Sequence, residues 1–460
     1  MIEQEISIPP PRKSNRLRLT AWTAADKALP MIYGVAVVAI PLHFGLLTTE
    51  AFGTWVVFQT LFLSISLTGD FFFLQPMVKL ASEFEADQRP IITAGSSLYT
   101  ILSLSLGSIV SIAALFLADI LKTGPTGAEA FALMVATVGA TIPRNIAIRV
   151  LQVDYSIVRI FLLDLVYFGG FVLCMIYGWQ TNTFSKTMDM VWYNLYTLIA
   201  SSVIGTLLCG VKIIPSFKNV VQATRRIVSI GLHQGGTGIM TIIQQNVDVG
   251  IVSATRGPLA AGVYTAARIF YRIFEALREA GQLLLISATS NAYSRDDKER
   301  VQDITVLATA TLVAILYPTT ILLILVAPIG IPLILPKVES PTTVFQWLIT
   351  SGFAMPFIIV PSSVLLGIGE TRDLFRGMLI GTIVLVGAGI GLTYEFGPDG
   401  MAAGVLLGNT TIAALLTKRM NRYIDFSFRG VLRRSRSLGT IARTRLKDFR
   451  FNSDRSSANS

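Results

Sequence analysis

The chain has 460 residues, of which 52% are apolar and only 14% are charged, and its formal net charge is +10. Soluble domains carry about 25% charged residues, so this composition excludes a soluble enzyme, a secreted disulfide scaffold and a disordered chain. Unbroken apolar runs of about twenty residues have the length that crosses a bilayer as a helix. The sequence therefore predicts an all-α polytopic membrane protein.

Residues 1–27 are predicted to form a polar cytoplasmic segment, and the apolar run from Ala28 onward is expected to insert into the membrane and stay there. Twelve transmembrane helices are predicted from this point. An N-lobe (28–212) contains helices at 28–47, 51–75, 91–117, 128–149, 159–179 and 190–211. A basic linker (213–226) precedes a C-lobe (227–424) with helices at 227–254, 259–290, 303–329, 343–367, 374–394 and 400–420.

The distribution of Lys and Arg predicts the orientation. With the N-terminus in the cytoplasm, 31 of the 38 basic residues lie on that side, four lie outside and three lie within span 259–290. The positive-inside rule then places both termini in the cytoplasm. The tail at 425–460 has nine basic and two acidic residues from Phe426 onward. It is expected to be disordered and to lie near anionic lipids.

The two lobes are related by a predicted internal repeat. Residues Glu50 to Ser82 align with Leu259 to Asn291, so that Gly53 falls on Gly262 and Trp55 falls on Tyr264. Six helices per lobe is an even number, which makes the repeat parallel. A transport site is then expected at the interface of the lobes, around a central cavity near the middle of the membrane.

Span 259–290 carries polar residues within an arc of about 120° at 100° per residue. Since a charge that faces lipid costs several kcal/mol, this stripe is expected to face protein or water. Its charges could neutralise one another through the pairs Arg272–Glu275 and Glu275–Arg278. The stripe nevertheless contains three Arg and only two Glu, which favours a cavity that binds an anionic ligand. Its members are Tyr264, Arg268, Tyr271, Arg272, Glu275, Arg278, Glu279 and Gln282.

A second polar face is predicted on span 227–254, where Thr237, Thr241, Gln244 and Asp248 lie within about 60° of each other. Asp248 is a candidate for ion coupling or for a salt bridge to an Arg of the next helix, and Glu275 is a candidate for the same roles. Several glycines from Gly231 onward allow close backbone approach or a bend.

Other intramembrane polar residues are expected to have smaller roles. Asp70 is expected at the cytoplasmic end of its helix, while Arg144 and Asn145 are expected to close theirs. The two His residues are too isolated for a metal site. The outer loops are too short for a folded active site, so we expect no enzyme activity, no cofactor and no nucleic-acid partner.

Four sequence motifs in this order resemble the polysaccharide transport family, a branch of the multidrug/oligosaccharidyl-lipid/polysaccharide flippase superfamily. The resemblance covers about residues 20–424. The motifs are Glu50-Ala-Phe52-Gly53 with Gly69-Asp70-Phe71; Asn246-Val-Asp248 with Gly257 and Ala261-Gly262-Val-Tyr264-Thr-Ala-Ala-Arg268; Gly367-Ile-Gly369-Glu-Thr-Arg372; and Gly397-Pro-Asp-Gly400-Met-Ala-Ala403-Gly404.

This resemblance implies two six-helix lobes that alternate between the two membrane faces. It implies a flippase that moves undecaprenyl-pyrophosphate-linked oligosaccharide to the outer leaflet of a bacterial inner membrane, for surface polysaccharide or exopolysaccharide synthesis. An H⁺ or Na⁺ gradient and the polysaccharide polymerase machinery are the implied partners.

The expected substrate-binding residues lie on the two polar faces. Arg268 and Arg272 are predicted to bind the pyrophosphate, because a guanidinium group forms planar bidentate hydrogen bonds with phosphate oxygens. Tyr264 and Tyr271 flank these arginines and could stack on sugar rings, and Gln244 is expected to contact the substrate from the preceding span.

Two other functions are compatible with a multi-pass chain. An ion-coupled multidrug exporter of the same superfamily would be expected to have an acidic cavity. A membrane glycan polymerase or ligase would be expected to have a large outer loop with catalytic Arg or His.

The Lys/Arg asymmetry leads to a topology prediction. A cytoplasmic reporter fused after Lys418 should be active and a periplasmic reporter should be inactive. The reason is that 31 basic residues on the inner side against four on the outer side keep this end of the chain in the cytoplasm. A periplasmic reporter that is active at this position would overturn the orientation.

Overall fold

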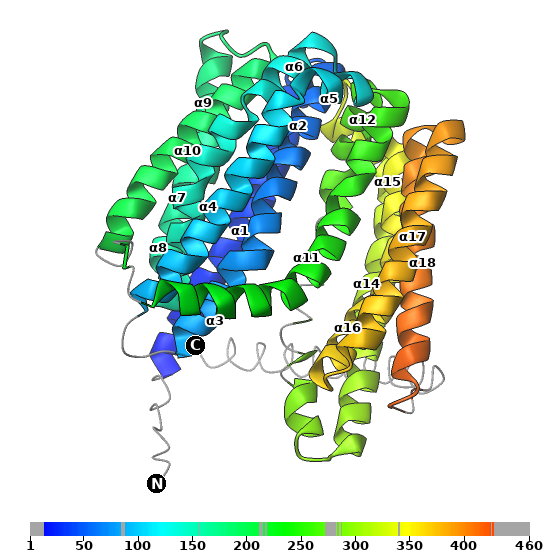
Figure 1. The fold of residues 1–460 in the computed structure, drawn as a ribbon. Helices are drawn as coiled ribbons and strands as arrows, with labels where there is room; N and C mark the ends of the chain where they lie inside the picture. The colour runs from blue at the N-terminus through cyan, green and yellow to red at the C-terminus, as the bar shows by residue number, and fades with distance from the viewer. Residues whose placement is uncertain are drawn as a thin grey trace, which may run out of the picture. The chain divides into compact units, whose positions relative to one another are not determined.

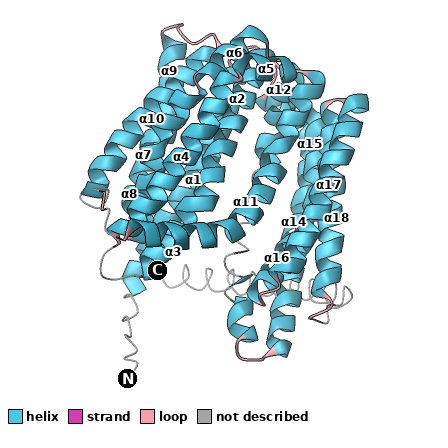
Figure 2. Ribbon diagram, in the orientation of Figure 1, coloured by secondary structure: helices cyan, strands magenta, loops and turns pink. Residues whose placement is uncertain are grey.

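A computed structural model describes residues 13–83, 88–154, 156–210, 215–216, 219–271, 282, 285–286, 288–338, 341–424 and 426. All regular secondary structure in these ranges is helical (Figure 1, Figure 2). The predicted all-α fold is therefore confirmed.

The chain divides into two compact units, each built from two segments. Unit 1 comprises Met1–Leu47 and Phe58–Ile239, and unit 2 comprises Thr48–Val57 and Met240–Ser460. The helices α2 and α11 therefore each contribute residues to both units. The predicted lobes at 28–212 and 227–424 stay a prediction.

Unit 1 contains α1 and the helices from the later part of α2 to the first half of α11, with two short π-helical turns, η1 and η2. Its elements are α1 (Lys13–His43), α2 (Thr49–Gly69), η1 (Asp70–Leu74), α3 (Gln75–Glu83), α4 (Arg89–Ile112), α5 (Ala114–Ile120), α6 (Gly124–Ala132), α7 (Met134–Val153), α8 (Ile157–Asp164), η2 (Leu165–Gly169), α9 (Gly170–Gln180), α10 (Thr187–Cys209) and α11 (Val220–Arg256).

Unit 2 contains the start of α2, the second half of α11 and the helices that follow it. Its further elements are α12 (Pro258–Arg268), η4 (Ile269–Tyr271), α14 (Lys298–Ile334), α15 (Pro341–Thr350), η5 (Ser351–Phe353), α16 (Pro356–Gly367), α17 (Thr371–Phe396) and α18 (Pro398–Met420). The turns η4 and η5 are 3-10 helical.

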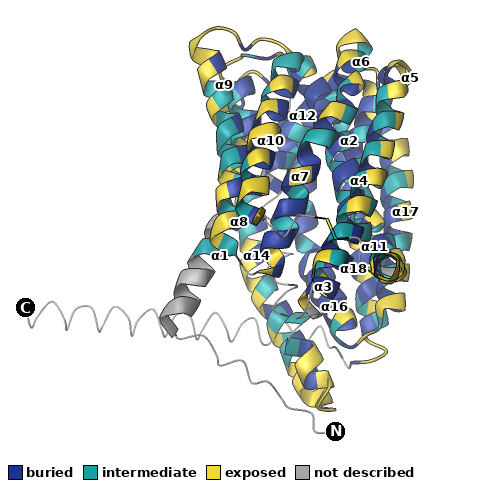
Figure 3. Ribbon diagram, turned by 60° about the vertical axis from the view of Figure 1, so that its left-hand side comes forward, coloured by how far each residue is buried: buried dark blue, intermediate teal, exposed yellow. Residues whose placement is uncertain are grey.

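The helices have the length and composition of a multi-pass membrane protein. Seven helical stretches among the described residues are long and apolar enough to span a membrane, or nine if two bent pairs each count once. Each of the twelve predicted spans overlaps a described helix, and the count of twelve crossings stays a prediction. Figure 3 shows exposed residues along α4 and α10, where Ile101, Ile109 and Leu207 are more than half exposed, as lipid-facing side chains are.

Two glycines that the repeat makes equivalent contact each other in unit 2. A Cβ atom on Gly53 would lie 1.8 Å from the carbonyl oxygen of Pro258 and 3.0 Å from the nitrogen of Gly262. A Cβ atom on Gly262 would lie 2.3 Å from the carbonyl oxygen of Thr49. The starts of α2 and α12 can therefore approach backbone to backbone only with glycine at both positions.

The predicted close approach along the glycine-rich part of α11 also occurs, within unit 1. A Cβ atom on Gly231 would lie 2.0 Å from the carbonyl oxygen of Phe72, and one on Gly238 would lie 2.4 Å from the Phe71 ring. The first half of α11 therefore packs directly on the π-helical turn η1. Gly231 lets the two backbones meet directly, and Gly238 leaves room for the Phe71 ring.

The glycine crossing gives a stability prediction. Gly53→Val should lower the thermal unfolding midpoint of the purified protein, because no rotamer change removes a clash with backbone atoms. Gly250→Ala is the matched control, since a Cβ atom at that position would have no other atom within 4 Å. Equal unfolding midpoints for the two variants would show that the crossing does not constrain the fold.

Candidate functional site

Asp248 of α11 is the centre of a buried polar cluster in unit 2. Its Oδ1 accepts a hydrogen bond from Arg268 Nη1 at 2.8 Å, and its Oδ2 accepts one from the Tyr264 hydroxyl at 2.7 Å. The side chain of Arg268 also donates to the carbonyl oxygen of Gln245 at 2.5 Å. The side chains that the sequence predicts on two successive spans therefore meet, across the sharp turn at Gly257.

The cluster is almost closed to its surroundings. The side chain of Asp248 is 3% exposed and that of Arg268 is 13% exposed, while Tyr264 is fully buried. A carboxylate and a guanidinium at hydrogen-bond distance compensate each other's charge, which removes most of the cost of burial in a bilayer. Of the two roles predicted for Asp248, the structure shows the salt bridge to the next helix.

The other described members of the two polar faces have different partners. The Tyr271 hydroxyl is hydrogen-bonded to Ser351 at 3.2 Å and to Asn409 at 3.0 Å. Gln244 donates to Thr382 of α17 at 2.7 Å, and Gln282 donates to Ser362 of α16 at 3.0 Å. The structure therefore brings Tyr264 together with Arg268, while Tyr271 and Gln244 join other contacts. The polar stripe of span 259–290 was expected to face protein or water. Its members Tyr264, Arg268, Tyr271 and Gln282 contact protein groups.

Several predicted site residues cannot be placed. Arg272, Glu275, Arg278 and Glu279 lie outside the described residues. The predicted roles of Arg272 and Glu275 therefore stay predictions.

The described residues of unit 1 contain two further ion pairs, both made by arginines of α7. Arg149 donates two hydrogen bonds to the Asp70 carboxylate, from Nε to Oδ1 at 2.8 Å and from Nη2 to Oδ2 at 2.5 Å. Arg144 pairs with Asp164 of α8, and its guanidinium carbon lies 4.6 Å from the centre of the Tyr167 ring. The side chains of Arg144 and Asp164 are 10% and 13% exposed. A cation held between a carboxylate and an aromatic face is stabilised by both.

These pairs change the sequence interpretation of unit 1. The sequence predicts Asp70 at a helix end, but its carboxylate lies inside continuous helix at the first residue of η1. Arg144 and Asn145 are predicted to close a helix, but α7 continues to Val153. Asn145 instead donates to Ser66 at 2.8 Å and to the Tyr99 hydroxyl at 2.7 Å.

Asp164 is a site candidate that the sequence analysis missed. A carboxylate within the apolar run 159–179 is the feature that could have revealed it, because such residues mark functional or paired positions. It is the last residue before η2, just as Asp70 begins η1. π-helical turns are rare and often occur at functional sites.

A fourth pair lies where α18 ends. Arg419 pairs with Asp373 near the start of α17, and the Tyr423 hydroxyl donates to the same carboxylate at 3.0 Å. This hydrogen bond raises the pKa of Tyr423 to about 12, because it stabilises the protonated phenol. The contacts fasten the two ends of the α17–α18 hairpin.

Metal binding has no support in the described residues, where no group of three or more His, Cys, Asp or Glu could hold an ion. Cys174 and Cys209 are not joined in a disulfide, and the Cys209 thiol donates to the carbonyl oxygen of Ala147 at 3.6 Å.

The cluster around Asp248 gives a stability prediction. Asp248→Ala should destabilise the protein by about 3–5 kcal/mol, because it leaves Arg268 buried without its carboxylate. Asp303→Ala is the matched control, since Asp303 is exposed and such substitutions stay within about 0.5 kcal/mol. Thermal unfolding in one detergent measures both variants. An unchanged midpoint for Asp248→Ala would mean that the pair does not stabilise unit 2.

Comparisons with solved structures show the fold. An inward-facing multidrug resistance MATE family transporter of the MOP superfamily matches with a TM-score of 0.71 and 16% identity, over 86% of this chain and 94% of the other. The inward closed conformation of the lipid II flippase MurJ matches with a TM-score of 0.71 and 14% identity, over 94% and 93% of the two chains.

A MOP superfamily transporter from Pyrococcus furiosus, described as having a binding pocket of reverse polarity, matches with a TM-score of 0.56 and 16% identity over 88% and 94% of the two chains. A search of curated protein sequences gave no match. Residues 45–338 match the profile of a family described as polysaccharide biosynthesis protein. This match spans more than half of the chain, from the start of α2 to the end of α14, and the chain belongs to that polysaccharide biosynthesis protein family.

Proposed function

We propose that this protein is a flippase that moves an undecaprenyl-pyrophosphate-linked oligosaccharide from the cytoplasmic to the outer leaflet of a bacterial inner membrane by alternating access. The family match and the fold shared with a lipid II flippase support a transporter of a polysaccharide precursor. The observation that carries the proposal is the buried Asp248–Arg268 pair. It keeps a guanidinium group within a membrane-spanning part of the chain, where that group could bind a phosphate.

The ion pair supports a mechanism in which the substrate and Asp248 compete for Arg268. A guanidinium group can form its bidentate bonds with a carboxylate or with a phosphate, but not fully with both. Neutralisation of Asp248 by a proton, or its occupation by Na⁺, releases Arg268 to the pyrophosphate. Departure of the substrate restores the pair. Arg272 supplies a second guanidinium in this proposal.

The orientation, with both termini cytoplasmic, belongs to the same proposal and is supported by the Lys/Arg asymmetry. The basic tail is then held at the anionic inner surface, and flipped product passes to the polymerase machinery.

A multidrug exporter is the second candidate, because the chain shares its fold with a multidrug transporter at a TM-score of 0.71. Export of a cationic dye from cells that overproduce the protein would favour it. The match to a polysaccharide biosynthesis protein family places this candidate second.

The phosphate role of Arg268 is tested in proteoliposomes that contain an undecaprenyl-pyrophosphate-linked oligosaccharide. Arg268→Lys should reduce the initial flipping rate roughly tenfold or more, since a charged hydrogen bond contributes about 1.5–3 kcal/mol. The control is the double variant Asp248→Asn/Arg268→Gln, which leaves no unpaired charge. Near wild-type flipping by this double variant would show that Arg268 is only the structural partner of Asp248.

The coupling role of Asp248 has its own test. Asp248→Asn should make flipping insensitive to an imposed pH or Na⁺ gradient, because the amide neither takes up a proton nor attracts a cation. The unsubstituted protein should respond to one of the two gradients. An equal response from both proteins would exclude Asp248 as the coupling group.

A further inference from the structure

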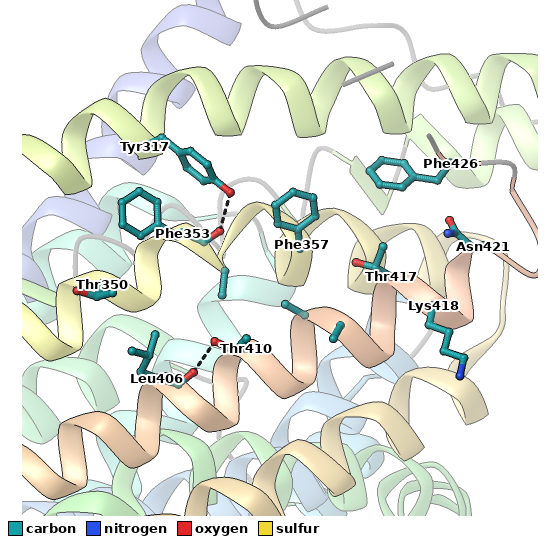
Figure 4. Close-up of a pocket in the computed structure, with 13 residues that line it drawn as sticks. Tyr317, Thr350, Phe353, Phe357, Leu406, Thr410, Thr417, Lys418, Asn421 and Phe426 are labelled. Atoms are coloured by element: carbon teal, nitrogen blue, oxygen red, sulfur yellow. Dashed lines mark hydrogen bonds between the residues drawn. The ribbon is translucent and has the colours of Figure 1, made fainter. Parts of the chain in front are cut away.

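An apolar groove in unit 2 lies between α18 and the wall formed by α14 and the bend that joins α15 to α16 (Figure 4). Its volume is about 690 Å³, which falls within the range of about 300–1,000 Å³ that ligand sites occupy. The bend of 47° between Pro341–Phe353 and Pro356–Gly367 places Phe353 and Phe357 along one wall. We propose that this groove binds one acyl chain of a phospholipid whose headgroup is anionic.

The two walls explain why the groove exists and why it is apolar. Tyr317, Phe353 and Phe357 form one wall, and Tyr317 and Phe357 also pack on the small core around Ala310 and Val313. The facing wall is a stripe on α18 with helical spacing and mostly small side chains. Its members are Leu406, Thr410, Ala413, Ala414 and Thr417.

Hydroxyl groups along most of the groove are already used within the protein. Tyr317 donates to the carbonyl oxygen of Phe353 at 3.2 Å, and Thr410 donates to that of Leu406 at 2.7 Å (Figure 4). Thr350 donates to the carbonyl oxygen of Gln346 at 2.6 Å. These groups therefore present carbon surface to an occupant. A hydrocarbon chain satisfies such a lining, whereas a sugar would leave its hydroxyls without partners.

The end of the groove near the C-terminus of α18 is different. Lys418, Asn421 and Phe426 line it. Lys418 and Asn421 are exposed, and Arg422 is exposed in the turn that follows. Lys418 makes no ion pair with any residue that the structure describes, and in Figure 4 its ammonium group points away from the aromatic wall. The Oγ1 atom of Thr417 is buried without a hydrogen-bond partner in the described chain. This end offers positive charge and hydrogen bonding to an anionic headgroup.

The length of the groove identifies the kind of lipid. Leu406 and Lys418 lie twelve positions apart on one helix, which is about 18 Å at 1.5 Å per residue. Half of a hydrocarbon core of about 30 Å is about 15 Å. One phospholipid acyl chain spans a leaflet, whereas a long polyprenyl chain would extend beyond the groove. In the predicted orientation the basic end lies at the inner leaflet, where anionic phospholipids can supply the headgroup.

The experiment uses the full-length protein in detergent, with phosphatidylglycerol and phosphatidylcholine of identical acyl chains as probes, and native mass spectrometry as the readout. Phosphatidylglycerol should be retained in preference to phosphatidylcholine. Lys418→Gln should lower this preference about fivefold, the effect of one basic residue near an anionic lipid.

Variants that fill the groove provide the second arm. Thr410→Trp should abolish retention, and Ala414→Phe should do the same at an exposed position that tolerates a larger side chain. Leu407→Trp is the matched control, because Leu407 is exposed on the same helix but does not line the groove.

Three results would overturn the assignment. They are equal retention of the two phospholipids, retention by both groove-filling variants, and displacement of phosphatidylglycerol by equimolar undecaprenyl phosphate. The last result would assign the groove to a polyprenyl tail. Because none of these measurements depends on flipping, they stand or fall separately from the proposed transport function.

Discussion

Compensation of ionised side chains in a medium of low dielectric constant constrains both units of this protein. Four buried or nearly buried carboxylates each lie against one arginine, and the arginines come from α7, α12 and α18. An isolated charge in such a place costs several kcal/mol, so each carboxylate fixes the position of the helix that carries its partner. In unit 1 a single helix, α7, holds both arginines and thereby fastens α2 and α8 to itself.

A buried ion pair is a weak source of stability, because well-packed apolar residues of similar volume often do as well or better. Packing alone therefore does not explain why Asp248 and Arg268 lie inside unit 2. The exchange that we propose would account for it. In that proposal a cation satisfies the carboxylate and a phosphate satisfies the guanidinium, so that neither state leaves an uncompensated charge in the membrane.

The sequence predicted the parts of this structure that depend on local pattern. Apolar runs located helices at all twelve expected places, and helical phase gathered Tyr264, Arg268 and Asp248 as candidates. Asp248 was a candidate for a salt bridge to an Arg of the next helix, and the structure places its carboxylate 2.8 Å from Arg268.

Features that depend on tertiary contacts were not predicted. The pair Asp70–Arg149 joins residues 79 positions apart, and nothing in either local segment specifies the other. The π-helical turns were also missed, because one inserted residue per turn leaves no mark in an apolar run. Tyr271 and Gln244 lie on the predicted polar faces, but their partners on α17, α18 and η5 could not be chosen from helical phase alone.

The irregular turns and the charges occur together, and this association has a physical reason. A π-helical turn shifts the backbone hydrogen bonds and re-aims the side chains that follow it. Asp70 is the first residue of η1, and Asp164 is the last residue before η2. Both carboxylates pair with arginines of α7. A backbone that has already left regular α geometry bends there at lower cost than elsewhere. Arg149 and Arg144 pair with these carboxylates, so η1 and the end of α8 are tied to α7 at the points where the backbone would otherwise bend at the lowest cost.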